Sequence, residues 1–212
     1  KFLTDIEEEV PDDVLAHASR LLILVSMYSK ELGQESRDAE KIYVGLLLNT
    51  NNSRLLEEFL VFGELLVKLL EGVKNQGPQV LKDGFIEMPV GGFEVANLEP
   101  AKVNVAINSM GRLYSLITMW CNVFTLIRSE GMGVKQLRFS LCFNVSPFKY
   151  LGTLVAMFQL GYRYADAKDM VAMCECLTVV GQSAEIPTWA TAVLLEGIMG
   201  YLGMRLRDAV GR

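Results

Sequence analysis

Apolar residues recur at helical spacing along most of this chain, and short polar, glycine or proline segments separate them. The first such stretch follows Pro11 and closes at Gly33, a residue type that commonly terminates helices. A second begins at Ser36. A third, from Arg54 to about Lys74, carries its apolar side chains along one side and is strongly amphipathic. The N-terminal part is therefore predicted to consist of helices.

Residues 84–95 do not follow this period. Their apolar residues flank a proline and glycine turn, which predicts two short strands joined as a β-hairpin. We expect the hairpin to belong to a connector at 84–97. This connector would join an acidic N-terminal helical lobe at 1–83 to a basic C-terminal helical lobe at 98–212.

The C-terminal half returns to helical spacing. Pro100 stands where the first residue of a helix would, and the pattern predicts one long helix from there to about Ser129. Further helices are expected at about 134–143, 147–161, 165–181 and 187–211. The predicted fold class is all-α: a two-lobed helical bundle with one short β-hairpin.

The composition is unusually apolar for a charged chain. Hydrophobic residues make up 51% of the 212 residues and the mean hydropathy is +0.28. The run Leu21–Met27 lies between Arg20 and Lys30, and it is far shorter than the roughly 20 residues of a membrane span. We expect no transmembrane helix and no targeting segment. Burial between protein copies is the expected use of the surplus apolar surface, since permanent interfaces resemble a core cut in half.

Residues that commonly carry catalysis or hold metals are scarce. His17 is the single histidine, with no second ligand at metal spacing. Cys174 and Cys176 are two residues apart, so they do not share a helix face, and all four cysteines are interpreted as free thiols. The chain contains no dinucleotide or P-loop glycine motif. We therefore expect a protein that is not an enzyme and that binds no cofactor or metal.

Charge is distributed unevenly along the chain. Residues 1–99 carry 9 Lys/Arg against 18 Asp/Glu, whereas residues 100–212 carry 11 against 7. The bias is strongest over 101–168, which contains 8 basic residues and only two acidic ones, Glu130 and Asp166. This asymmetry indicates either a polyanion site or self-association of unlike surfaces.

Aromatic residues are interleaved with the cations of this basic segment. Cations neutralise phosphates, and rings stack on unpaired bases for roughly 1–3 kcal/mol per base. The predicted RNA-binding residues are Lys135, Arg138, Lys149, Arg163, Arg112, Arg128, Phe148, Tyr162 and Tyr164. The alternative is that the rings belong to the core and the cations only make the outer face soluble.

Part of this segment resembles the coat proteins of flexuous filamentous plant viruses and related helical nucleoproteins of segmented negative-strand RNA viruses. The resemblance is carried by Met119-Trp120-Cys121, Leu137-Arg138-Phe139-Ser140-Leu141-Cys142 and Ser146-Pro147, all within residues 119–147. The later Arg/Asp pairing of that family has its nearest candidates in Arg163 and Asp166.

The resemblance implies an all-α capsid or nucleocapsid subunit that assembles helically with copies of itself and coats single-stranded RNA without sequence preference. It implies a location in the virion and the host cytoplasm. The competing hypothesis is an all-helical interaction or scaffold module that binds no nucleic acid and docks through its acidic and basic halves. An enzyme would need an apolar pocket for a small molecule.

Overall fold

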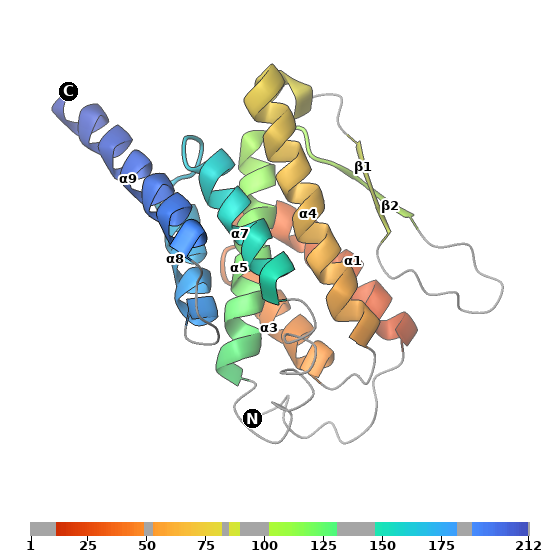
Figure 1. Cartoon of the computed structure of the whole chain (residues 1–212). Coiled ribbons are helices and arrows are strands. Elements are labelled where there is room, and N and C mark those ends of the chain that lie inside the picture. The colour runs from red at the N-terminus through yellow and green to blue at the C-terminus, as the bar shows by residue number, and fades with distance from the viewer. Residues whose placement is uncertain are drawn as a thin grey trace.

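The computed structural model describes residues 12–48, 53–81, 85–89, 102–130, 147–181 and 188–211, and in them the chain is built from helices (Figure 1). The all-helical class is therefore confirmed. The helices are α1 (Asp12–Met27), α2 (Ser29–Leu32), α3 (Gln34–Leu48), α4 (Ser53–Gln76), α5 (Met110–Glu130), α7 (Pro147–Gly161), α8 (Ala167–Gly181) and α9 (Thr188–Val210). A short 3₁₀ helix, η1 (Pro78–Leu81), follows α4. The helix expected at 134–143 lies outside the described residues.

Helix ends follow local chemistry more closely than periodicity. The first predicted helix is split, because α1 stops at Met27 and α2 continues to Leu32. Gly33 ends α2 with φ of +58°, a left-handed conformation that glycine adopts readily. The next helix begins at Gln34, two residues before the expected Ser36.

The predicted hairpin within 84–95 is not seen. Strand β1 (Phe85–Pro89) instead pairs antiparallel with β2 (Lys102–Ala106), so that Phe85 lies opposite Ala106 and Pro89 opposite Lys102. The prediction of a helix starting at Pro100 was therefore wrong, since α5 begins only at Met110. The reason is local: apolar residues alternate at 103, 105 and 107, which is the period of a strand.

One hydrophobic core runs through both halves of the chain. Helix α5 lies at its centre, where Trp120 is fully buried, and Leu66 of α4 and Phe158 of α7 are buried in the same cluster. Leu22 of α1 and Leu194 of α9 extend this cluster to the two outer helices. The expected two-lobed arrangement is not confirmed, because helices from both predicted lobes share this core.

Close helix approach depends on glycine at two points. A side chain at Gly63 of α4 would place its Cβ 2.5 Å from the indole of Trp120. At the end of α7, a Cβ at Gly161 would lie 2.5 Å from the hydroxyl of Tyr114, which donates a hydrogen bond to the Gly161 carbonyl. Burial and the charge of Asp169 raise the pKa of the Tyr114 phenol, so this donor keeps its proton.

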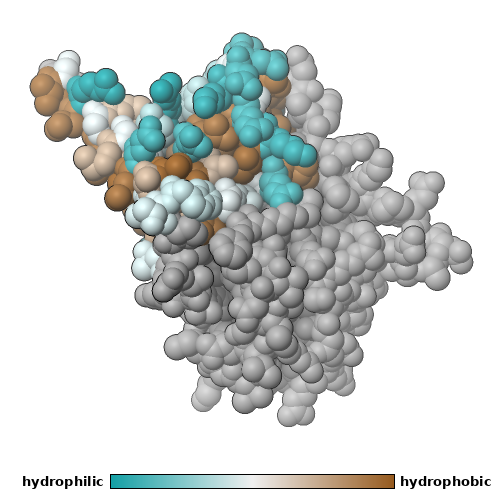
Figure 2. Space-filling model, in the orientation of Figure 1, coloured by the Kyte–Doolittle hydropathy of each residue, from teal (hydrophilic) through white to brown (hydrophobic). Residues whose placement is uncertain are grey.

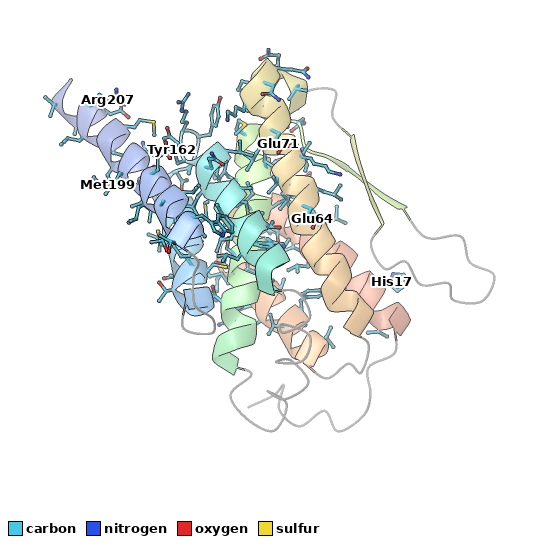
Figure 3. All side chains as sticks on the ribbon, in the orientation of Figure 1. His17, Glu64, Glu71, Tyr162, Met199 and Arg207 are labelled. Atoms are coloured by element: carbon cyan, nitrogen blue, oxygen red, sulfur yellow. The ribbon has the colours of Figure 1, made fainter. Side chains whose placement is uncertain are left out.

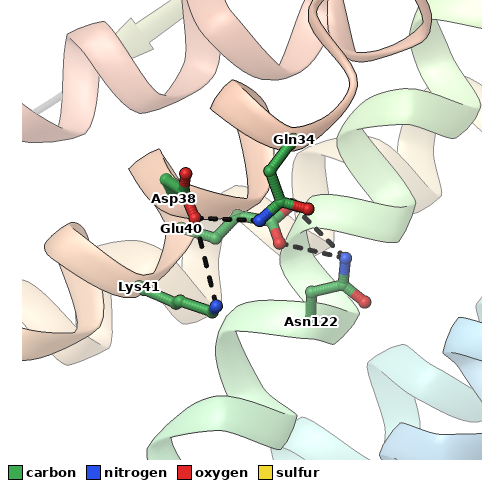
Figure 4. Close-up of polar contacts among 5 residues, drawn as sticks. All are labelled: Gln34, Asp38, Glu40, Lys41 and Asn122. Carbon is green, nitrogen blue, oxygen red and sulfur yellow. Dashed lines mark hydrogen bonds and ion pairs between the residues drawn. The ribbon is translucent and has the colours of Figure 1, made fainter.

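A buried carboxylate joins α3 to α5 (Figure 4). Glu40 is only 5% exposed, and the side-chain amide of Asn122 donates hydrogen bonds of 3.1 and 3.3 Å to its two carboxylate oxygens. On the exposed side of α3, Gln34 donates to Asp38, which also forms a 3.9 Å ion pair with Lys41. Burial raises the pKa of Glu40 to about 7, although Asn122 and the charge of Arg37 oppose the shift.

Candidate nucleic-acid interface

One end of the bundle gathers the starts of α5 and α8 and the end of α7. The bond from Tyr114 in the first turns of α5 to Gly161 at the end of α7 fixes two of these helices together. Helix α8 runs parallel to α5, since Thr118 donates a 2.9 Å hydrogen bond to Asp169 and, further along both helices, Cys121 is hydrogen-bonded to Cys176. The C-terminal half of α9 lies at the same end (Figure 1).

Arg112 brings the first cation to this end. It lies in the first turn of α5, where its backbone N–H is 3.3 Å from the Ser109 hydroxyl that accepts it. Its guanidinium carbon lies 5.3 Å from the ring centroid of Tyr28, a cation–π distance, and that ring is 46% exposed. The Nζ of Lys30 lies 3.9 Å from the position that a Cβ at Gly111 would take, so a second cation is close to this helix start.

The turn that joins α7 to α8 carries the second cation. Arg163 is exposed, its Nε donates a 3.2 Å hydrogen bond to the hydroxyl of Tyr162, and its guanidinium lies 5.7 Å from that ring. Tyr164 follows with 40% of its surface exposed. A cation and two aromatic rings are therefore held at the surface by one short turn.

Helix α9 supplies a third Arg–Tyr pair, in which the ring is buried, since Tyr201 is only 8% exposed. Arg205 lies 5.2 Å from the ring of Tyr201 and donates a 3.0 Å hydrogen bond to the carbonyl of Ala165. This bond ties α9 to the turn that carries Arg163. We call the seven residues at this end the Arg–Tyr cluster: Tyr28, Arg112, Tyr162, Arg163, Tyr164, Tyr201 and Arg205.

Two carboxylates lie within this surface, and the start of α8 uses both. Asp166 and Asp169 form a reciprocal capping box: the backbone N–H of each donates to the side chain of the other, at 2.9 and 3.0 Å. Burial favours a higher pKa for Asp166, but hydrogen bonds from Asp169 and Lys168 and the charge of Lys30 lower it overall. Burial raises the pKa of Asp169.

The three arginines form no ion pair with these two aspartates, although the charges of Asp208 and Asp166 act on Arg205 from a greater distance. Among the residues that the structure describes, no carboxylate oxygen lies within 4.0 Å of the guanidinium groups of Arg112, Arg163 or Arg205. Their charges are therefore available to an anion.

The predicted RNA-binding residues do not all meet at one place. Arg112, Tyr162, Arg163 and Tyr164 belong to the Arg–Tyr cluster. Arg128 lies near the far end of α5, about 24 Å along the helix from Arg112 at 1.5 Å per residue.

Two more predicted residues lie away from the cluster, and two are not described. Phe148 and Lys149 begin α7, so they also lie at the end of the bundle opposite to Tyr162, which follows the last turn of that helix. Lys135 and Arg138 lie outside the described residues.

Three residues of the cluster were not predicted from the sequence. Tyr201 and Arg205 are four residues apart on one helix, a spacing that places them on the same face and could have been recognised. Tyr28 and Arg112 are 84 positions apart in the sequence, so no local sequence pattern predicts their contact.

Other chemistry is sparse in the described part of the chain. His17 is exposed on α1, away from the Arg–Tyr cluster (Figure 3). No group of three or more His, Cys, Asp or Glu side chains could hold a metal ion within the described ranges. Cys121, Cys174 and Cys176 carry free thiols, and Cys142 is not among the described residues. A hydrogen bond with Cys176, together with burial, raises the pKa of Cys121, which disfavours its reactive thiolate form.

The helices described here include none that is both long and apolar enough to cross a membrane. Comparison with protein-family models, with curated proteins and with solved structures finds no match for this chain.

Proposed function

We propose that this chain is a structural subunit that binds single-stranded RNA without sequence preference through the Arg–Tyr cluster and associates with further copies of itself, as a viral coat or nucleocapsid protein does. The observation that carries the proposal is the convergence of three Arg–Tyr pairs from α5, α9 and the turn after α7. Arginines neutralise phosphates, and exposed rings stack on bases of any sequence.

The fixed geometry of the cluster suits this role. Arg112, Arg163 and Arg205 are each positioned against a ring, so little side-chain entropy is lost when a phosphate binds. Tyr164 presents an exposed ring beside them. A site that reads bases by hydrogen bonds would need polar groups aimed at base edges, whereas cations and rings alone give binding that tolerates any sequence.

The salt dependence of RNA binding tests this proposal. A labelled oligouridine is titrated with the protein at roughly 50 to 200 mM salt, and the logarithm of the affinity is plotted against the logarithm of salt concentration. Each phosphate contact on a single strand contributes about 0.7 to the slope, so the double variant Arg112→Ala, Arg163→Ala should lower it by about 1.4. Lys41→Ala removes an exposed cation of α3 and is the matched control.

A second variant separates stacking from charge. Tyr164→Ala should weaken binding about 5- to 150-fold while leaving the salt slope unchanged, because it removes a ring but no cation. Binding that is absent at low salt would refute the proposed interface, as would a salt slope that the double variant Arg112→Ala, Arg163→Ala leaves unchanged.

The second candidate function is an all-helical interaction module with no nucleic acid. The observation in its favour is the large exposed apolar side chains of α1 and α9, which include Leu21, Leu24, Met199 and Leu206. This function predicts protein that purifies free of nucleic acid and still self-associates or captures a protein partner.

A further inference from the structure

Helix α9 is apolar on two opposite sides. Ala190, Leu194, Gly197 and Tyr201 are buried on the inner side, where Gly197 lies against the backbone of Phe158 in α7. A second set, which we call the outer stripe, is more than half exposed: Leu195, Met199, Leu202, Leu206 and Val210. At about 100° per residue, the two sets lie about 150° apart around the helix.

The outer side of α9 can be followed in Figures 2 and 3. In Figure 3, Met199 lies on the outer side of α9 and Tyr162 lies on the side toward α7. Figure 2 shows hydrophobic surface along α9 at the upper left, interrupted by polar side chains. An apolar helix side is normally buried, so the outer stripe is expected to be covered by a partner outside this chain.

The spacing of the outer stripe selects a helix as that partner. Its first four members follow one another at intervals of four, three and four residues, which is the heptad pattern of a coiled-coil seam. Each of the five side chains is more than half exposed, so a partner helix that covers the outer stripe would bury an apolar seam.

We propose that two copies of this chain pair through α9, antiparallel across a two-fold axis that passes near Gly200 and Tyr201. In this register Met199 of one copy lies level with Leu202 of the other, and Leu195 lies level with Leu206. The heptad positions therefore match in every layer, because an antiparallel seam places each a residue opposite a d residue.

The charges of α9 complement one another in the same register. Glu196 and Arg207 lie on the same flank of the outer stripe, and Glu196 of one copy comes level with Arg207 of the other to within about 3 Å along the axis. The two-fold axis makes this contact twice. Parallel pairing would instead place the charged flanks of the two copies on opposite sides of the seam, so that neither Glu196 nor Arg207 would meet an opposite charge. Self-complementarity is what a two-fold interface requires, and a foreign partner does not require it.

This pairing extends the proposed function and does not depend on RNA. It is measured on nuclease-treated protein, so failure of pairing and failure of RNA binding are separate results. Sedimentation velocity over a range of protein concentrations should show a monomer–dimer equilibrium. Leu202→Asp places two carboxylates at the centre of the seam and should raise the dimer dissociation constant about 100-fold or more. Circular dichroism checks that the variant remains helical.

The matched control makes the same change on the other exposed apolar helix. Leu24 of α1 is 47% exposed, against 54% for Leu202, and Leu24→Asp should leave the dimer intact. A chain that stays monomeric overturns the proposal, as does a dimer that Leu24→Asp breaks and Leu202→Asp does not. A monomer that binds phosphatidylcholine vesicles through Leu202 would assign the stripe to a lipid surface and overturn the pairing as well.

Charge exchange tests the antiparallel register. Glu196→Arg and Arg207→Glu should each weaken self-pairing, because each variant sets like charges together twice. Mixed in equal amounts, the two variants should form a heterodimer, since every contact then joins Arg to Glu. A mixture that associates no better than either variant alone would overturn the register.

Discussion

The buried carboxyl of Glu40 should make the stability of the protein depend on pH. Its pKa in the folded chain is about 7, against an ordinary value of 4.5, because burial disfavours the charged form. Between these two values the folded state binds more protons than the unfolded state, so stability falls as pH rises from about 4.5 to about 7. This pKa difference lowers the free energy of unfolding by about 3 kcal/mol at pH above 7, and it has no effect below pH 4.5.

The variant Glu40→Gln isolates this contribution. Glutamine has nearly the same shape, and its carbonyl oxygen can still accept a hydrogen bond from the amide of Asn122. Urea unfolding should find the variant about 3 kcal/mol more stable than the parent chain at pH 8 and about equally stable at pH 4.5.

Taking the difference between the two proteins at each pH removes the contributions of all other titrating groups. Asp38→Asn on the exposed side of the same helix is the control, and its difference from the parent should stay within about 0.5 kcal/mol. A difference between Glu40→Gln and the parent that stays constant from pH 4.5 to 8 would refute the reasoning, because the carboxyl would then titrate alike in both states.

Three further substitutions test the packing by urea unfolding at fixed pH. Gly63→Ala should destabilise the chain by about 1–3 kcal/mol, because its Cβ would meet the indole of Trp120, which is fully buried. Tyr114→Phe should cost about 0.5–1.5 kcal/mol, because one hydrogen bond is lost while the Gly161 carbonyl keeps the backbone N–H groups of Tyr164 and Ala165. Asp169→Ala should cost about 1–2 kcal/mol, because the backbone N–H of Asp166 and the hydroxyl of Thr118 both lose their acceptor.

Glycine in open helical surroundings supplies the control for these measurements. At Gly152 of α7 and Gly203 of α9, an added Cβ would have no neighbour within 4 Å, so alanine at either site should be neutral or stabilise by about 0.5–1 kcal/mol. If Gly63→Ala behaves like these two variants, α4 and α5 do not approach through that glycine. A Tyr114→Phe variant as stable as the parent would mean that the Tyr114 hydroxyl adds nothing to the two backbone N–H donors that the Gly161 carbonyl retains.

Helices with one clear apolar side were predictable, and so were those bounded by proline or glycine. The amphipathic segment expected from Arg54 to Lys74 is α4, and Pro147 and Gly161 bound α7 as the pattern indicated. The strand β2 was missed because Pro100 favours a helix start. The alternating valines of β2 instead form a strand that pairs with β1, and this partner is provided only by the folded chain.

The candidate site was predictable only where sequence neighbours share it. Tyr162, Arg163 and Tyr164 are contiguous, so their turn was visible as a cation between two rings. The contribution of Arg112 depends on α5 lying against α1, which is a long-range packing result. The position of Phe148 and Lys149 at the opposite end follows from the length of α7, and no count of charges along the sequence contains that information.

Helix α9 carries both the third Arg–Tyr pair and the outer stripe. RNA binding and self-pairing of the chain are therefore coupled equilibria. In the proposed pair, each Arg205 lies about 7 Å along the axis from the two-fold, so both clusters come to the same flank, about 14 Å apart along the helix axis. A strand held by one cluster then meets the other at a high effective concentration. RNA must therefore strengthen pairing by the same factor by which pairing strengthens RNA binding, and assembly begins at a protein concentration that RNA lowers.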